Sequence, residues 1–248
     1  MKYRLIPFRY FNAFMNMALD EAIMKSVRSG EAHPTIRFYG WDPSAVSIGI
    51  FQGILNEVNL ETCKGAGVDV VRRLTGGGAV YHDRLGEVTY SIIAPVDAFD
   101  ANIIVSYEQI CEGIVLALKS LGLPAGFERI NDILVNGRKI SGNAQTRRDG
   151  ILLQHGTILY NVDVNKMFSY LNVSSEKVSD KLIKSVQKRV TSVAELANVS
   201  MQDLQDSLQE GFSHERDVEI GEYSDSELKH ATSIAKEKFS SEAWNFRL

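Results

Sequence analysis

Residues 72–83 read RRLTGGGAVYHD and follow directly on Val68-Asp69-Val70-Val71, a β-branched run that predicts a buried strand. Three successive glycines, Gly76 to Gly78, expose backbone N–H groups at the strand end, so an anionic group or a narrow ligand can approach the main chain. The flanking Arg72 and Arg73 suit phosphate or carboxylate, with charge-assisted hydrogen bonds worth about 1.5 to 3 kcal/mol each. The segment is not a P-loop, because GxxxxGK[ST] is absent, and no GxGxxG opens a helix as in a dinucleotide fingerprint. By composition alone, a flexible turn with solvated arginines is an equally good interpretation.

A second polar segment, residues 131–145, reads NDILVNGRKISGNAQ. Its Asn136-Gly137 pair predicts a two-residue hairpin turn, because these residues tolerate the positive φ angles that such a turn requires. Lys139 comes just after the turn, among small polar residues and without an obvious acidic partner. We expect it to reach into a cleft and hold negative charge that develops on a carbonyl or α-phosphate oxygen. An exposed hairpin lysine is the ordinary alternative, and spacing alone does not exclude it.

The remaining elements follow from hydrophobic periodicity and from Gly, Pro and capping signals. Strands paired through hairpins and interspersed with helices favour a mixed α/β or α+β sheet over a regular βαβ series. The predicted helices are Met15 to Ser29, Asn59 to Lys64, Ile104 to Leu121, Ser200 to Phe212 and one after the capping-box sequence Ser224-Asp225-Ser226-Glu227; the further predicted strands are Thr35 to Tyr39, Ala45 to Phe51, Glu87 to Ala94 and Ile151 to Tyr160.

Composition narrows the class of protein. The chain has 248 residues, 44% of them apolar, and a formal net charge of −4, which argues against a general nucleic-acid binder because phosphate binding needs clustered Lys and Arg. The first residues lack the layout of a signal peptide, and no apolar run approaches the roughly 20 residues of a membrane helix. We therefore expect a cytoplasmic protein that binds neither nucleic acid nor membrane. Cys63 and Cys111 fall in apolar helical patterns, so both are predicted to be buried structural thiols.

Several separated segments together resemble one family. RRxTGGGAVYHD at 72–83, ND at 131–132 and GRKISGNA at 137–144 are similar to the motifs of the lipoate-protein ligase A catalytic domain, in the biotin/lipoate ligase superfamily. NMALDEA at 16–22, QHGTIL at 154–159 and EAWNF at 242–246 extend the resemblance over nearly the whole chain. The resemblance implies a central mixed β-sheet flanked by helices, related to the core of class II aminoacyl-tRNA synthetases.

The resemblance also implies a reaction. Lipoate and ATP with Mg²⁺ would give lipoyl-AMP, and the lipoyl group would then pass to a lysine of a lipoyl-domain protein, such as a 2-oxoacid dehydrogenase subunit or a glycine cleavage H protein. Lys139 would be catalytic, contacting both the acyl carbonyl and the phosphate. The residues that would contact the substrate or ATP are Arg72, Arg73, Gly76, Gly77, Gly78, Ala79, Val80, Tyr81, His82, Asp132, Lys139, Ser141, Gly142 and His155. For deprotonation of the acceptor lysine, His82, Asp83 and His155 are candidates by residue type alone.

The resemblance departs from the family pattern at one place. Ligases of this family that work alone carry a smaller C-terminal domain, whereas this sequence ends at Leu248. We therefore expect a single catalytic domain over residues 1–248, with residues 195–248 as a small helical flank. We also expect a separate accessory subunit to support adenylation.

Other functions remain open at this point. The main alternative is an octanoyl or lipoyl transferase that moves an acyl group between carrier proteins without ATP. Transferases of that kind use a nucleophilic cysteine near the lysine motif, and residues 126–132 contain none. A transferase without such a cysteine is harder to exclude. A binding module that has lost catalysis and a biotin ligase are weaker alternatives, because the Arg, Gly and Lys set is complete and the glycine-rich loop of biotin ligases is absent.

Overall fold

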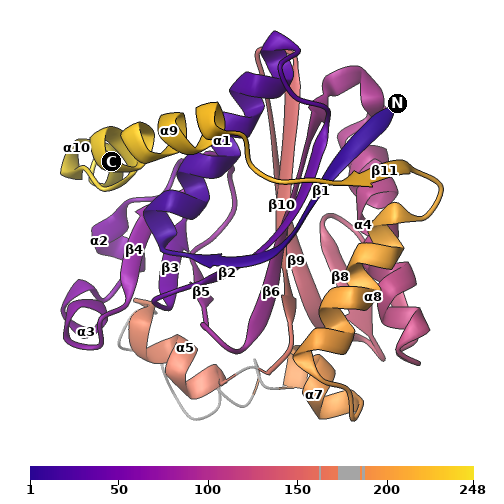
Figure 1. The fold of residues 1–248 in the computed structure, drawn as a ribbon. Helices are drawn as coiled ribbons and strands as arrows, with labels where there is room; N and C mark the ends of the chain where they lie inside the picture. The colour runs from indigo at the N-terminus through magenta and orange to yellow at the C-terminus, as the bar shows by residue number, and fades with distance from the viewer. Residues whose placement is uncertain (162, 173–184, 186–187) are drawn as a thin grey trace.

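The computed structural model describes residues 1–161, 163–172, 185 and 188–248 (Figure 1). Within these residues, eight strands form one mixed sheet in the order β11-β1-β2-β6-β10-β9-β8-β7, and three form a second sheet in the order β4-β3-β5. The strands of the large sheet are β1 (Lys2–Phe11), β2 (Thr35–Trp41), β6 (Glu87–Pro95), β7 (Ala125–Glu128), β8 (Asp132–Val135), β9 (Arg138–Arg148), β10 (Ile151–Leu159) and β11 (Asp217–Ile220); those of the small sheet are β3 (Ala45–Ile48), β4 (Asp69–Arg72) and β5 (Val80–His82).

Helices cover both faces of the large sheet (Figure 1). The described helices are α1 (Ala13–Ser29), α2 (Ile54–Glu57), α3 (Leu60–Gly65), α4 (Ile103–Ser120), α5 (Val164–Tyr170), α7 (Val193–Leu196), α8 (Met201–Ser213), α9 (Asp225–Ile234) and α10 (Glu242–Asn245), with the short turns η1 (Val96–Ala98) and η2 (Ala235–Phe239). Strand β2 shows how the two faces arise, because its side chains alternate. Ile36 and Phe38 pack into the core under α4 and α8, whereas Tyr39 and Trp41 pack into the core under α1.

The predicted fold class is confirmed, and so are most of the predicted elements. Helix α1 begins after Asn12, whose side chain accepts a hydrogen bond from the Met15 N–H, and ends at Gly30, which has φ of 76°. Both α8 and α9 open with capping boxes, at Ser200 and Ser224. The hairpin turn between β8 and β9 has positive φ at Asn136 and Gly137, as that dipeptide predicts. Cys63 and Cys111 are both buried, also as predicted.

Several elements differ from the prediction. Strands β1, β5, β7 and β11 and helices α5 and α10 were not predicted, because each is short or lacks a clean apolar period. The predicted strand at 45–51 ends at Ile48, since Gly49 packs against the glycine-rich segment instead of continuing the sheet. In the C-terminal quarter, β11 pairs with β1 in the large sheet and α8 packs against α4.

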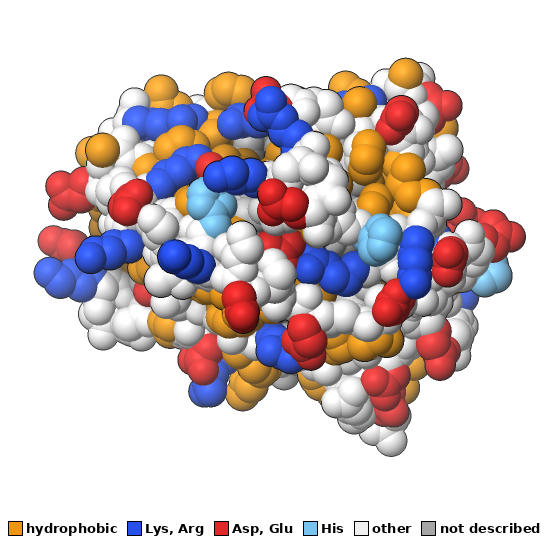
Figure 2. All heavy atoms as spheres, turned by 45° about the horizontal axis from the view of Figure 1, so that its top comes forward, with side chains coloured by type: hydrophobic (Ala, Val, Ile, Leu, Met, Phe, Trp, Pro, Cys, Tyr) orange, Lys and Arg blue, Asp and Glu red, His pale blue; other side chains and the backbone are white. Residues whose placement is uncertain are grey.

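The surface in Figure 2 intersperses Lys and Arg with Asp and Glu, and neither sign forms a broad field on that face. In the part of the chain that the structure describes, no helix is both long enough and apolar enough to cross a membrane.

Candidate active site

A cavity of about 380 Å³ is enclosed by residues of both sheets, a volume within the range of roughly 300–1,000 Å³ usual for small-ligand sites. The large sheet contributes residues of β2, β6, β9 and β10, and the small sheet contributes residues of β3 and β5. Its apolar wall includes Met17, Tyr39, Trp41, Ala79, Val80, Tyr81, Leu159, Val164, Met167 and Val190. Such a wall suits an acyl chain, and the polar groups are concentrated in a few places.

Arg73 organises the glycine-rich segment. Its guanidinium donates to the carbonyl oxygens of Ser47, Gly76 and Gly78 and to the hydroxyl of Thr75, so its N–H groups are engaged by the protein itself. Burial lowers the pKa of Arg73 to about 10. The side chain therefore braces the loop around the cavity, and a phosphate would have to displace these bonds.

Two glycines are required where the segment packs closely. Gly77 has φ of 95°, in the left-handed region that strongly favours glycine. A Cβ on Gly49 would lie 2.1 Å from the carbonyl oxygen of Gly77, so the two backbones touch directly. Gly76 and Gly78, by contrast, face open space. Of the two, Gly78 lines the cavity, where its bare backbone leaves room for a ligand.

Arg72 points away from the cavity. Its guanidinium donates to the carbonyl oxygens of Gly49 and Gln52 in the loop after β3, and to those of Trp244 and Asn245 in α10. It is fully buried among these acceptors. Arg72 therefore ties the C-terminal helix to the loop that supports the glycine-rich segment.

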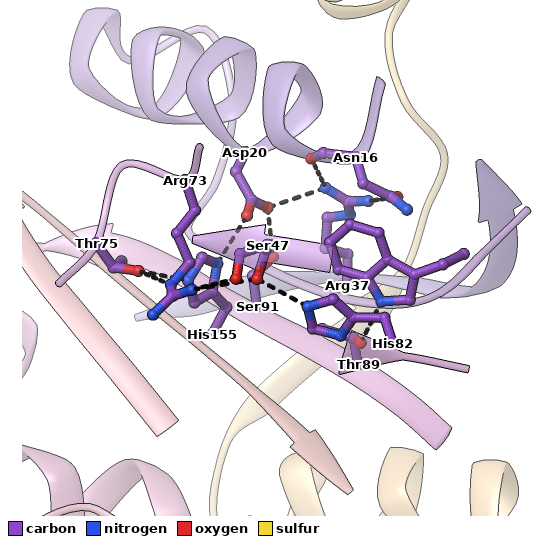
Figure 3. A network of polar contacts seen from close by, with 11 residues as sticks. Asn16, Asp20, Arg37, Ser47, Arg73, Thr75, His82, Thr89, Ser91 and His155 are labelled. Atoms are coloured by element: carbon purple, nitrogen blue, oxygen red, sulfur yellow. Dashed lines mark hydrogen bonds and ion pairs between the residues drawn. The ribbon is translucent and has the colours of Figure 1, made fainter. Parts of the chain in front are cut away.

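Two imidazoles lie in buried hydroxyl–imidazole–carboxylate chains at the cavity (Figure 3). Nε2 of His155 is 2.7 Å from the hydroxyl of Thr75, and its Nδ1 is 3.2 Å from Asp20. Asp20 in turn accepts hydrogen bonds from Arg37 and Ser91. Burial would raise the pKa of Asp20, but Arg37, His155 and Ser91 hold it below its usual value. Burial lowers the pKa of His155, which favours a neutral ring.

The second chain runs through His82. Its Nε2 is 2.8 Å from the hydroxyl of Ser47, and its Nδ1 is 2.7 Å from Glu87. Trp41 stacks on the His82 ring with centroids 4.0 Å apart and donates its indole N–H to Thr89. The bond from Arg73 to the Ser47 hydroxyl joins this chain to that of His155 in one continuous network. These bonds fix both rings in the cavity wall.

Lys139 forms the exposed polar corner of the cavity. Its Nζ lies 2.7 Å from Oδ1 of Asp132, and the two side chains are 41% and 31% exposed. Asp132 is paired with Gly142 across the β8–β9 ladder, so the lysine side chain lies over a residue with no side chain. The Lys139 backbone is held by the N–H of Thr191. The expectation that Lys139 has no acidic partner was wrong, because the hairpin brings Asp132 alongside it.

The structure distributes the predicted site residues in two sets. Those that line the cavity are Arg73, Gly78, Ala79, Val80, Tyr81, His82, Lys139, Gly142 and His155. Arg72, Gly76, Gly77, Asp132 and Ser141 do not line it, although Asp132 contacts Lys139. The cavity is also lined by four residues that were not predicted from the sequence: Trp41, Ser47, Glu87 and Asn143. A usable signal did exist for the network behind them, because Asn16 and Asp20 place two polar side chains four residues apart on the buried face of α1.

Comparison with known proteins gives a family and a set of relatives. Residues 12–213 match the model of the lipoyl protein ligase A/B catalytic domain. The octanoyltransferase LipM of Brevibacillus brevis is 34% identical, with 99% of each chain covered, and that of Kyrpidia tusciae is 36% identical, with 99% of this chain and 98% of the relative covered. A solved structure from Thermoplasma acidophilum, described as a bi-partite lipoate protein ligase, has a TM-score of 0.89 and 34% identity, covering 99% of this chain and 96% of that chain.

The octanoyltransferase relatives contradict the predicted reaction. The prediction of an ATP-dependent, AMP-forming lipoate ligase with ATP and Mg²⁺ as cofactors was wrong. The relatives that match this chain over nearly their whole length are named for transfer of an octanoyl group. The geometry is consistent with this correction. Arg72 and Arg73, which were expected to meet phosphate, both donate to backbone carbonyl oxygens of the protein.

Proposed function

The chain belongs to the lipoyl protein ligase A/B catalytic-domain family, and on this premise we propose that it transfers an octanoyl group, without ATP, from a carrier-protein thioester to a lysine of a lipoyl-domain protein. The observation that carries the proposal is the charge of the cavity. Of the two Arg and Lys side chains that line it in the described part of the chain, Arg73 is buried and engaged, and Lys139 reaches solvent. One exposed cation suits the single oxyanion of a neutral thioester better than it suits a triphosphate.

The other site residues have roles in this proposal that follow from their positions. Gly78 to Tyr81, together with Trp41, would enclose the acyl chain. His82 and His155 are held by buried partners and would shape that pocket, not act as free bases. The acceptor would be a lipoyl domain of the 2-oxoacid dehydrogenase or H-protein type. No adenylation step remains in this reaction, so the accessory subunit once expected for it is not required.

The proposal is tested by supplying the two possible acyl sources separately. Purified chain is mixed with an unmodified lipoyl domain and either octanoyl carrier protein without nucleotide, or free octanoate or lipoate with ATP and Mg²⁺. We expect acylation of the lipoyl domain, measured by intact mass, from the thioester at a rate unchanged by ATP. Product formed only from a free acid with ATP would overturn the proposal.

A further inference from the structure

The cavity reaches the surface along one face of β10. His155, Thr157 and Leu159 all line it, as does Asn161 just beyond the end of the strand. Residues two apart lie on the same face of a strand, so these side chains form one row. His155 is buried, Thr157 and Leu159 are half-buried, and Asn161 is exposed. The row therefore runs from the interior of the cavity to solvent.

The position of Lys139 divides this row. Thr157 lies opposite Gly142 in the ladder between β9 and β10, and the ammonium of Lys139 lies over Gly142. A thioester carbonyl beside that ammonium has the buried walls of the cavity on one side and the stretch from Thr157 to Asn161 on the other. The acyl chain fills the buried side, so the thiol side of the donor has to leave through the exposed stretch.

Helix α5 supplies the other wall of this exposed stretch. Its Val164 and Met167 line the cavity, and the helix begins only a few residues beyond Asn161. Nζ of Lys166 in α5 lies 2.6 Å from Oδ2 of Asp83, which also lines the cavity. In Figure 1, α5 lies below β3 and β5 of the small sheet. We call the space that Thr157, Leu159, Asn161, Val164 and Met167 line the outer channel.

The polar groups of the outer channel suit a neutral ligand with amide groups. Among the residues that the structure describes, neither the hydroxyl of Thr157 nor the carboxamide of Asn161 has a hydrogen-bond partner. Each can both donate and accept, and the apolar Leu159 lies between them in the row. The charged side chains nearby that line the cavity, Asp83 and Asp163, are acidic and so disfavour a phosphate.

We infer that the outer channel binds the pantetheine arm on which the donor carries its thiol, with Thr157 and Asn161 as hydrogen-bond partners of the amide groups of the arm. This inference rests on the proposed function, which requires a thioester donor. The hydrocarbon parts of the arm lie against Leu159 and Met167. Its thiol end holds the acyl carbonyl beside Lys139, and its other end leaves the protein at Asn161. Coenzyme A carries the same arm as a carrier protein, so the chemistry recognised is that of the arm itself.

Donors that present the same octanoyl group on different thiols test the inference. Transfer to the lipoyl domain is measured with octanoyl-N-acetylcysteamine, which keeps only the amide nearest the thiol, and with octanoyl-pantetheine, which keeps the whole arm. We expect kcat/KM to be about 10-fold higher for octanoyl-pantetheine, the gain that a further hydrogen bond can give. Octanoyl-coenzyme A and octanoyl carrier protein should both exceed the short thioester, and the faster of them identifies the source of the arm. Equal kcat/KM for octanoyl-pantetheine and octanoyl-N-acetylcysteamine would overturn the inference.

Substitutions in the outer channel add a second readout, the ratio of kcat/KM for octanoyl-pantetheine to that for octanoyl-N-acetylcysteamine. Met167→Trp, which fills the channel, should bring this ratio close to one. Asn161→Ala, an exposed change, should lower it by about 3 to 10-fold. The matched control is Phe168→Trp, in the same helix at a residue that does not line the cavity, and it should keep the ratio within about 2-fold of the parent chain. Thermal denaturation checks that each variant folds.

The outcomes separate this inference from the proposed function. A ratio that is the same in the parent chain and in folded Asn161→Ala would show that the arm does not lie in the outer channel, while transfer from thioesters would still stand. Absence of transfer from every thioester, with or without the full arm, would refute the proposed function itself.

Discussion

Gly142 determines how Lys139 lies in the cavity. A Cβ built on Gly142 would be 2.8 Å from Nζ and 2.9 Å from Cε of the lysine, closer than real contacts allow. The same Cβ would press against the far end of a flexible side chain, which can move aside at little cost, and would make an ordinary contact with Oδ1 of Asp132 at 3.7 Å. The glycine therefore matters for the position of one ammonium group more than for the stability of β9.

This geometry makes a prediction about Gly142→Ala. We expect kcat to fall by about 10 to 100-fold, because the displaced ammonium no longer lies beside Asp132 and the carbonyl oxygen. The free energy of unfolding should change by less than about 1 kcal/mol, since no backbone atom is contacted. Steady-state transfer assays and thermal denaturation measure the two quantities. Gly126→Ala in β7, where a Cβ meets nothing within 4 Å, is the matched strand-glycine control. Equal activity in the two variants would show that the position of Lys139 is unimportant.

At the scale of elements, the C-terminal helix supports the cavity from a distance. Asn245 of α10 accepts the backbone N–H of Arg72 and donates its amide to the carbonyl oxygens of Phe239 and Ser241. Arg72 in turn holds the loop that contains Gly49, whose backbone touches Gly77. Helix α10 is thus connected to the glycine-rich segment through buried hydrogen bonds.

Replacing Asn245 with Ala should therefore destabilise the protein. The substitution leaves the Arg72 N–H and the Phe239 carbonyl oxygen without this partner in a buried place, whereas the Ser241 carbonyl oxygen still accepts the backbone N–H of residue 245. Each unsatisfied group costs about 1 to 3 kcal/mol. Allowing for partial relaxation, we expect the free energy of unfolding to fall by about 2 to 4 kcal/mol in denaturant titrations. Glu242→Gln, an exposed change in the same helix, should stay within about 0.5 kcal/mol. Similar stabilities for the two variants would mean that α10 does not brace Arg72.

The elements that the sequence predicts are those with strong local signals. Helix α4, the β8–β9 hairpin and the capped helices α8 and α9 carry apolar periods or turn residues that specify them without reference to the rest of the chain. Strands β1 and β11 pair with each other across more than 200 residues, and the mixed burial along β1 gives no clean alternation. Their existence depends on tertiary pairing, which a local pattern does not contain.

At the scale of the whole molecule, the cavity is assembled from both sheets, and this explains which site residues were predicted. Residues near the glycine-rich segment and Lys139 occur in dense motifs, so the sequence identified them. Ser47 and Glu87 are 35 and 5 residues from His82 along the chain, and only the folded sheets bring them to its two ring nitrogens. In the same way, Arg73 is close to the glycines in sequence, but its hydrogen-bond partners depend on the loop geometry. Its guanidinium donates to the carbonyl oxygens of Gly76 and Gly78, so these N–H groups are not free to bind a phosphate.

The buried network also predicts how stability depends on pH. Burial lowers the pKa of His155 below the usual 6.5, against the opposing effect of Asp20. Below about pH 6.5 the unfolded chain therefore takes up a proton that the folded chain does not, so stability is full above that pH and is lost as pH falls through the folded-state pKa. The loss should approach about 1.4 kcal/mol per pH unit. Asp20 titrates in a lower range, because its pKa is held below its usual 3.8.

Denaturant titrations between pH 7.5 and 5, at roughly half-unit steps, measure this dependence. The free energy of unfolding should change less steeply with pH for His155→Gln than for the parent chain, and His33→Gln controls for loss of an exposed imidazole. Parallel slopes for the parent chain and His155→Gln would show that His155 is protonated equally in the folded and unfolded states, and that its contact with Asp20 is that of a charged pair.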